Sequence, residues 1–215
     1  MIKLIITDIG GVLVKTDEAI LSCIEEVFRK NNIPPGSKQD LLKAFGVSIF
    51  DYIKSYLPKE HKDKAVFCYE EFKKIYPSKA TQLMKVYSGV DETLFYLKKN
   101  GIKLCVLSCM IKHEVKTNLS LLNFKDFDLV FSLEDYNIKR PMPDGLNMIM
   151  KRVNVLPNET IYVGDTVNDI KMAKNAQVIS VAVKTGLQST EDLKKEHPDY
   201  LIDDFSKLKE LIDKL

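Results

Sequence analysis

Short apolar runs recur along this chain, and longer stretches with a different hydrophobic spacing separate them. A strand inside a parallel sheet is covered on both faces, so it reads as a continuous apolar run. The separating stretches place apolar residues three and four positions apart, which is typical of amphipathic helices. The alternation indicates an α/β fold with a Rossmann-like parallel sheet that helices cover on both faces. The predicted strands span residues 3–7, 103–108, 129–132, 160–164, 178–183 and 200–202.

The stretch from residue 16 to residue 85 breaks this alternation, because its apolar positions have only helical spacing. We expect Pro58 and Pro77 to punctuate its helices, since proline cannot continue a helix without losing a hydrogen bond. The sequence therefore predicts an all-helical cap domain at 16–85. This domain is inserted into a core domain formed by residues 1–15 and 86–215.

The composition narrows the class of protein. Hydrophobic residues make up 45% of the 215 residues, and the net charge is only +2 with basic and acidic residues interspersed. We therefore expect no nucleic-acid partner. No apolar run approaches the roughly 20 residues of a membrane span, and the N-terminus lacks a signal-peptide pattern. The four cysteines form no C-x-x-C pair, so no disulfide framework or zinc site is expected. These features favour a cytoplasmic location without a membrane partner, and we expect a monomer or homodimer.

Two of the predicted strands end on an aspartate. Asp8 follows the first strand, and Asp165 follows the strand at 160–164 and is joined by Asp169 four residues later. In open α/β sheets, ligands bind beyond the carboxyl ends of the strands, so we expect these carboxylates to share one crevice. Hard oxygen ligands of this kind suit Mg²⁺. Alternatives remain open, since aspartate is also common in turns and at helix N-termini.

Four short motifs at compatible spacings extend this picture. They are Asp8-Ile9-Gly10-Gly11-Val12-Leu13, Ser108 at a strand end, Arg140-Pro141-Met142-Pro143-Asp144, and Gly164-Asp165-Thr166-Val167-Asn168-Asp169. With them the chain resembles the haloacid dehalogenase superfamily over essentially its whole length. The resemblance is to the subgroup with a helical cap after the first strand, in the phosphoglycolate-phosphatase-like branch.

The resemblance implies a Mg²⁺-dependent phosphatase acting on a small phosphorylated metabolite. Asp8 would be the nucleophile, because a carboxylate can attack phosphorus to form an aspartyl phosphate that water then hydrolyses. Mg²⁺ would be held by Asp8, Asp165 and the backbone carbonyl of Gly10. Asp169 would reach the ion through water or orient a ligand.

The other two motifs would contact the phosphoryl group. Ser108 is expected to donate a hydrogen bond to a phosphoryl oxygen, although it could also cap a helix. Cys109 beside it is a candidate pocket residue, with a role as buried filler as the alternative. Arg140 stands where the family normally has lysine and would stabilise the transferring phosphoryl group. Lys139 is a second candidate for that task.

Gly10 departs from the family pattern. Most phosphatases of the superfamily carry an aspartate at this position, which protonates the leaving group and then activates water. A good leaving group, or a proton donor from the cap, would explain its absence. A phosphonatase-type C–P hydrolase using Lys38, Lys43 or Lys54 as a Schiff base is one alternative, and a catalytically weakened binding or regulatory protein is another. The cap is expected to close about hinges near residues 15–17 and 85–89.

Overall fold

A parallel β-sheet of six strands lies at the centre of the computed structural model, which describes residues 1–34, 48–135 and 140–215. The strand order is β5-β4-β1-β6-β7-β8, and every neighbouring pair is parallel. The predicted α/β fold with a parallel sheet is therefore confirmed. The strands are β1 (Leu4–Thr7), β4 (Lys103–Leu107), β5 (Leu129–Phe131), β6 (Thr160–Gly164), β7 (Ile179–Val183) and β8 (Tyr200–Ile202).

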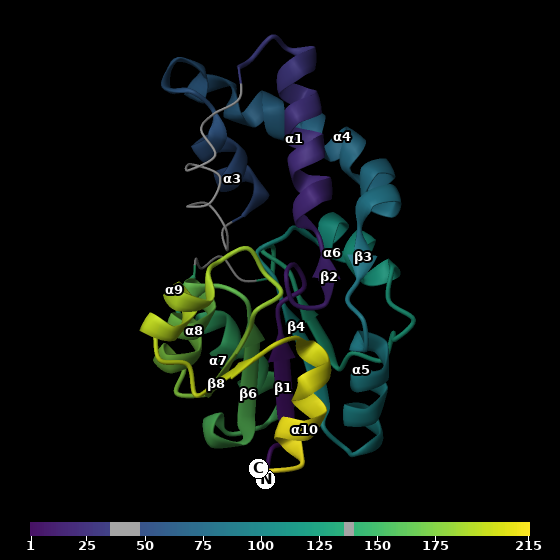
Figure 1. Cartoon of the computed structure of the whole chain (residues 1–215), viewed down its shortest axis with the longest axis vertical. Coiled ribbons are helices and arrows are strands. Elements are labelled where there is room, and N and C mark those ends of the chain that lie inside the picture. Colours follow the sequence, from purple (N-terminus) through teal and green to yellow (C-terminus); the bar gives the residue numbers. More distant parts are fainter. Residues whose placement is uncertain (35–47, 136–139) are drawn as a thin grey trace.

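Helices cover both faces of the sheet, as the continuous apolar strands require (Figure 1). On one face, Ile5 of β1 packs with residues of α5 (Val90–Lys99), α6 (Lys112–Ser120) and α10 (Leu208–Ile212). On the other face, Leu4 and Ile6 pack with α7 (Asp144–Val153) and α8 (Val167–Asn175). Successive strand residues thus enter opposite layers of the core. The remaining short helices are α9 (Thr190–Lys195) and the 3₁₀ turns Pro157–Glu159 and Phe205–Lys207.

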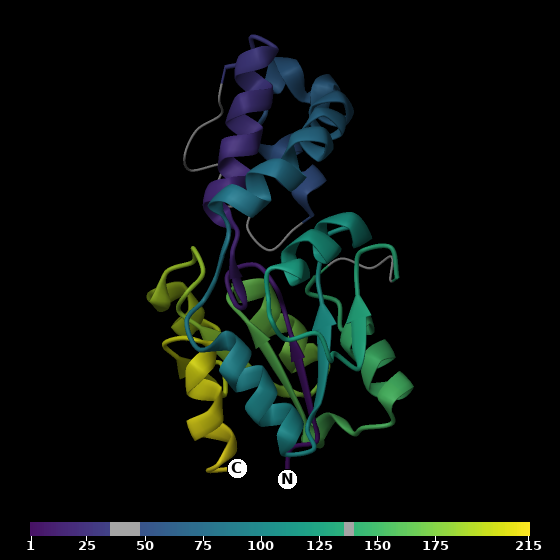
Figure 2. The ribbon, with the colours of Figure 1, turned by 90° about the vertical axis from the view of Figure 1, so that its right-hand side faces the viewer.

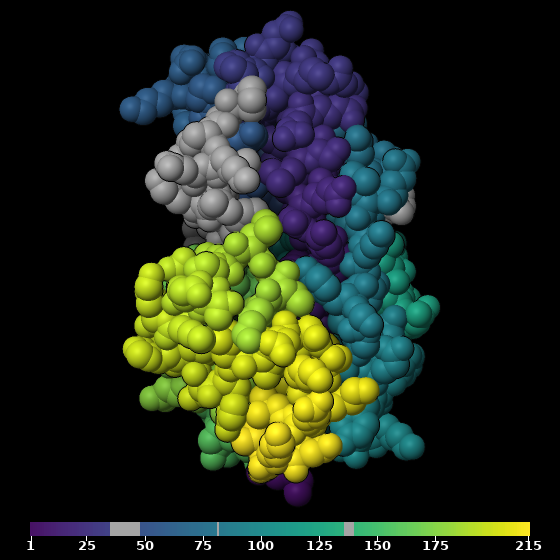
Figure 3. Space-filling model, viewed as in Figure 1, coloured from purple at the N-terminus to yellow at the C-terminus, as the bar shows by residue number. Residues whose placement is uncertain are grey.

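A second layer of helices stands beyond the carboxyl ends of the strands, at the opposite end from both chain termini (Figures 1 and 2). It contains α1 (Asp17–Lys30), α3 (Ile49–Tyr56) and α4 (Ala65–Leu83), with a 3₁₀ helix at Lys59–Lys64. Aromatic contacts hold it together: the rings of Phe28 and Tyr56 stack with centroids 5.5 Å apart, and those of Phe72 and Tyr76 with centroids 4.9 Å apart. The surface view in Figure 3 shows this layer resting on the sheet layer.

Two short strands connect the layers. β2 (Val14–Lys15) leads into α1 and β3 (Lys85–Val86) leads out of α4, and the two pair antiparallel with Val14 opposite Val86. Sequence reasoning missed this pair, because two residues are too few to show a strand period. The connectors overlap the hinge positions expected from the sequence, and closure about them stays a prediction.

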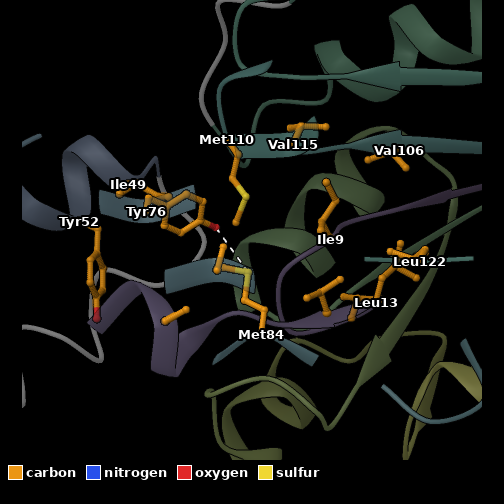
Figure 4. Packing of buried hydrophobic residues seen from close by; sticks show 14 of the residues in the cluster. Ile9, Leu13, Ile49, Tyr52, Tyr76, Met84, Val106, Met110, Val115 and Leu122 are labelled. Atoms are coloured by element: carbon orange, nitrogen blue, oxygen red, sulfur yellow. Dashed lines mark hydrogen bonds between the residues drawn. The ribbon is translucent and has the colours of Figure 1, made fainter. Parts of the chain in front are cut away.

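The apolar core continues from one layer into the other. Figure 4 shows Ile49, Tyr76 and Met84 of the helical layer near Met110 and Ile9 of the sheet layer, with the Tyr76 hydroxyl 3.9 Å from the Met84 sulfur. This shared core packs the helical layer against the sheet layer.

Two details of the helices bear on the sequence predictions. α4 runs through Pro77, so the expectation that this proline punctuates the helices is wrong. Gly101 follows the end of α5 with a φ of +77°, the left-handed conformation in which helices commonly end. Within the described residues, none of the helices combines the length and apolar character needed to cross a membrane.

Candidate functional site

Three neighbouring strands deliver the predicted site residues to one edge of the sheet. Asp8 directly follows β1, Ser108 follows β4 on one side, and Asp165 follows β6 on the other. The backbone N–H of Asp8 donates to the carbonyl of Val163, 3.0 Å away, so the sheet ladder extends to the aspartate itself. The expectation that distant carboxylates meet at the carboxyl ends of the strands is met.

Asp8, Asp165 and Asp169 form a compact carboxylate cluster. One oxygen from each lies within 4.8 Å of the others, and the three residues are 8%, 7% and 1% exposed. Burial in this cluster raises the pKa of Asp8 and the pKa of Asp165, and repulsion from neighbouring carboxylates adds to the effect. Such a site strongly favours a cation.

Arg140 supplies one cation to the cluster. Its Nη1 lies 2.8 Å from Oδ2 of Asp8 and 2.5 Å from Oδ1 of Asp169, and its Nη2 donates to the carbonyl of Leu107 over 3.2 Å. The side chain is only 2% exposed. Burial opposes its charge, but the carboxylates of Asp169 and Asp8 outweigh burial and raise the pKa of the guanidinium. The structure thus places the predicted arginine on the predicted nucleophile.

Asp169 is held by several donors at once. Its Oδ2 accepts from the Thr166 hydroxyl at 2.6 Å and from the backbone N–H groups of Thr166 and Asp165 at 3.0 and 3.2 Å. Its Oδ1 accepts from the Tyr162 hydroxyl at 2.9 Å, in addition to Arg140. Thr166 is the N-cap of α8, so the alternative reading of Asp165 as that cap is wrong.

Two glycines leave room for the Asp165 carboxylate. A Cβ atom on Gly11 would lie 2.2 Å from Oδ2 of Asp165, and one on Gly186 would lie 1.9 Å from the same oxygen. The Thr185 hydroxyl donates to the Gly11 carbonyl, and the Tyr87 hydroxyl donates to the Thr185 carbonyl over 2.8 Å. Sequence reasoning missed these contacts, because a glycine needed for close approach looks the same in sequence as any other.

The cluster opens into a cavity between the two layers. Its walls contain Asp8, Gly10, Ser108, Cys109, Arg140 and Asp165, which are the predicted site residues other than Asp169 and the lysine candidates. Ser108 does not cap α6, whose N-cap is Ile111; instead its Oγ accepts from the Met110 N–H at 3.2 Å. The helical layer contributes further lining residues that the sequence did not single out: Asp17, Ile20, Ile49 and Tyr52.

Lysine candidates find no support in the described part of the chain. Lys54 is exposed and is not among the residues that line the cavity. Lys38, Lys43 and Lys139 lie outside the described residues. Arg140 is therefore the single basic residue among the described residues of the cavity wall.

Known proteins are similar to this chain in sequence over nearly its whole length. The chain is 27% identical over 215 residues to the pyrophosphatase PpaX of Bacillus mycoides, covering all of this chain and 98% of the relative. It is 28% identical to the PpaX of Oceanobacillus iheyensis, over 94% of this chain and 93% of the relative. These relatives span nearly the same length as the chain.

Solved structures match the fold over almost the whole chain. A predicted phosphoglycolate phosphatase of Haemophilus somnus superposes with a TM-score of 0.89 at 21% identity, with 98% of each chain covered. The β-phosphoglucomutase of Clostridium difficile gives a TM-score of 0.83 at 24% identity, covering 100% of this chain and 96% of that one. The model of the haloacid dehalogenase-like hydrolases matches residues 5–183, which include the whole carboxylate cluster. The chain belongs to the haloacid dehalogenase-like hydrolase family.

Proposed function

We propose that this hydrolase is a Mg²⁺-dependent phosphatase that cleaves a small phosphorylated metabolite through an aspartyl phosphate on Asp8. The observation that carries the proposal is the position of Asp8, which lies in the cavity wall, 2.8 Å from Arg140 and within 4.8 Å of Asp165 and Asp169. The names of its relatives, a pyrophosphatase and a phosphoglycolate phosphatase, support the same reaction class.

Asp8 is oriented from two sides before any substrate binds. Its Oδ1 accepts from the Ile9 N–H at 2.8 Å, and its Oδ2 is paired with Arg140. In the proposed reaction an Oδ atom attacks phosphorus while the bond to the leaving oxygen breaks. Arg140 would stabilise the negative charge on the phosphoryl oxygens, and Ser108 at the tip of β4 would donate a hydrogen bond to one of them.

The donor set fits a hard divalent cation. Three buried carboxylates face one guanidinium, which leaves the cluster with excess negative charge. Asp8, Asp165 and the Gly10 carbonyl would hold Mg²⁺, and the bound ion would supply charge neutralisation for two approaching anions. Asp169 already accepts five hydrogen bonds, so we assign it to positioning Arg140 and the start of α8, with any contact to the ion through water.

The proposal also assigns a separate role to each of the two layers. Residues 1–15 and 86–215 would form the catalytic core and residues 16–85 the cap, whose side chains Ile20, Ile49 and Tyr52 enclose the substrate. Closing the cap would exclude water from the phosphoryl group. A cytoplasmic location and a monomeric or homodimeric state remain predictions from the sequence.

The test is a screen of phosphorylated metabolites with and without Mg²⁺, followed by Asp8→Asn on any substrate found. We expect turnover to require Mg²⁺ and to fall to background in Asp8→Asn, because an amide is too weak a nucleophile. Asp126→Asn is the matched control, since Asp126 is 75% exposed and pairs only with Lys98 at 3.5 Å among the salt bridges of the described residues. Undiminished turnover in Asp8→Asn would exclude the mechanism. Tight metabolite binding without turnover would favour the binding-protein alternative.

A further inference from the structure

Among the described residues, the side-chain atoms nearest to the space beside Gly10 belong to no acidic group. A Cβ atom at this position would lie 2.9 Å from the Thr16 Oγ1 and 3.6 Å from the Met110 Cε. An alcohol holds its proton too tightly to act as a general acid near neutral pH, and a thioether has no proton to give. The nearest side-chain groups to this position are therefore a hydroxyl and a methyl group.

The rest of the cavity wall is dominated by apolar and aromatic side chains. Ile20, Ile49, Tyr52, Met110 and Leu187 line it, and Ile49 and Tyr52 are only 5% and 4% exposed. A wall of this kind gains free energy by covering an apolar group and gives little compensation to a strongly hydrated one.

Within the described part of the chain, one carboxyl group outside the cluster lines the cavity, that of Asp17. Asp17 is the first residue of α1. Its negative charge would repel a second phosphate group, as pyrophosphate would carry into the site.

We propose that the substrate is a phosphate ester of an acidic hydroxyl group, of the phenol or enol class, borne on an apolar body. This inference rests on the proposed phosphatase function and names its substrate class. When an Oδ atom of Asp8 bonds to phosphorus, the phosphorus–oxygen bond of the ester breaks and its electron pair stays on the leaving oxygen. That oxygen departs as a stable anion and needs no proton from the protein. Water then adds to the phosphorus of the aspartyl phosphate, which returns the Asp8 carboxylate and releases phosphate and a proton to solvent.

A series of substituted phenyl phosphates tests the leaving-group requirement. We would measure kcat/KM at fixed pH and Mg²⁺, because this ratio reports the first chemical step even when hydrolysis of the aspartyl phosphate limits kcat. We expect kcat/KM to fall by roughly 100-fold or more from the most to the least acidic phenol, which is the scale of a missing general acid. If kcat/KM of the unaltered protein does not change with the acidity of the phenol, the inference is overturned.

Two substitutions sharpen this test. Gly10→Asp introduces a carboxyl group and should make kcat/KM less dependent on the acidity of the phenol, because it raises turnover of the substrates with the poorest leaving groups. Asparagine has nearly the same shape as aspartate but no acidic proton, so Gly10→Asn should keep the same dependence of kcat/KM on phenol acidity as the unaltered protein. If kcat/KM of the unaltered protein does not depend on the acidity of the phenol, and Asp17→Asn makes it depend strongly, then Asp17 is the general acid and the inference is wrong. The slope of the unaltered protein decides the matter even where a variant fails to fold.

The apolar body is tested separately with Ile49→Ala. Comparing phenyl-type phosphates with acetyl phosphate, we expect KM to rise several-fold for the aryl substrates and to stay unchanged for acetyl phosphate, which has almost no apolar surface to cover. An equal rise for both substrates would contradict an apolar contact. Pyrophosphate should give a lower kcat/KM than the aryl substrates, and the reverse order would overturn the proposed class. If no substrate shows Asp8-dependent turnover, it is the phosphatase function that fails; turnover with a flat dependence rejects only this inference.

Discussion

At the scale of single residues, the site depends on the fork of Arg140. One nitrogen joins Asp8 to Asp169, and a second nitrogen holds the carbonyl of Leu107 at the end of β4. A lysine is a single point charge on a flexible stem, so it can pair with carboxylates but cannot keep both attachments in one plane. The arginine therefore sets the position of the Asp8 carboxylate as well as its charge balance.

Two substitutions of Arg140 distinguish the effect of its forked geometry from the effect of its positive charge. We expect Arg140→Lys to lower kcat/KM by roughly 10- to 100-fold, because the positive charge remains while the bond to the Leu107 carbonyl is lost. Arg140→Ala should lose more activity and about 3 kcal/mol of unfolding free energy, since it leaves buried carboxylates unpaired. Steady-state kinetics and urea unfolding provide the two measurements. Arg152→Lys, at a surface residue that stacks on Phe131, should leave kcat/KM unchanged; full activity in Arg140→Lys would contradict the role of the fork.

Gly186 offers a second prediction at this scale. Its φ lies outside the left-handed range, so Gly186→Ala acts only through the Cβ atom placed 1.9 Å from the Asp165 carboxylate. We expect it to displace that carboxylate and to lower kcat/KM by at least tenfold, with weaker Mg²⁺ binding in calorimetry. Gly101→Ala is the opposite case: no heavy atom lies within 4 Å, but φ is +77°, so about 1 kcal/mol of stability should be lost with activity intact. Normal Mg²⁺ affinity in Gly186→Ala would show that Asp165 tolerates the added atom.

At the scale of elements, the contact between α4 and α6 joins the helical layer to the sheet layer. The Tyr69 hydroxyl of α4 lies 3.2 Å from Oε1 of Glu114, and the Tyr76 hydroxyl lies 3.0 Å from Nδ2 of Asn118 on the next turn of α6. Glu114 is only 1% exposed and also accepts from the Ile111 N–H at 3.1 Å. Burial raises the pKa of Glu114 to about 7, although Ile111, Tyr69 and Lys73 act in the opposite direction.

This buried acid makes stability depend on pH. Because the pKa of Glu114 is about 7 in the folded state and 4.5 ordinarily, its contribution to stability is fully present below pH 4.5 and is lost as pH rises through 7. The loss should be on the order of 2–3 kcal/mol. In Glu114→Gln this fall in urea-unfolding free energy between pH 5 and pH 8 should disappear. Glu92→Gln, at an exposed site on α5, should keep it; an unchanged pH profile in Glu114→Gln would locate the titration elsewhere.

Elements differ in how far the sequence could predict them. The strands at 160–164 and 200–202 were predicted with their observed bounds, because a buried strand needs several consecutive apolar residues. The pairing of Val14 with Val86 was missed, since it depends on the chain returning to the same place after the inserted helices. Pro77 was misread because local preference disfavours proline inside a helix, while the buried Phe72, Tyr76 and Ala80 hold α4 together from both sides of it.

At the scale of the whole molecule, the parallel sheet brings residues that are far apart in the sequence into one site. Asp8 and Asp165 could be predicted to meet because parallel strands share one carboxyl edge, and Arg140 was placed correctly by its motif. The surroundings of Asp165 could not be predicted, because Gly11 and Gly186 approach it from distant parts of the chain. The hydrogen bond between Thr185 and Gly11, which joins these two parts, spans 174 positions. Which cap side chains line the cavity likewise follows only from how the helices pack on the sheet.

The pairing of β2 with β3 has a consequence for how such a protein can diversify. Because the helical layer leaves and re-enters the sheet layer at directly opposed residues, Val14 and Val86, its two ends are only one strand spacing apart. A different helical module with similarly close ends could be exchanged at this junction without altering the path of the chain through the sheet. In the proposed phosphatase, substrate recognition and bond cleavage would therefore lie on separate segments of the chain. Transplanting the segment between the two valines from a relative is expected to change selectivity while Asp8 is retained.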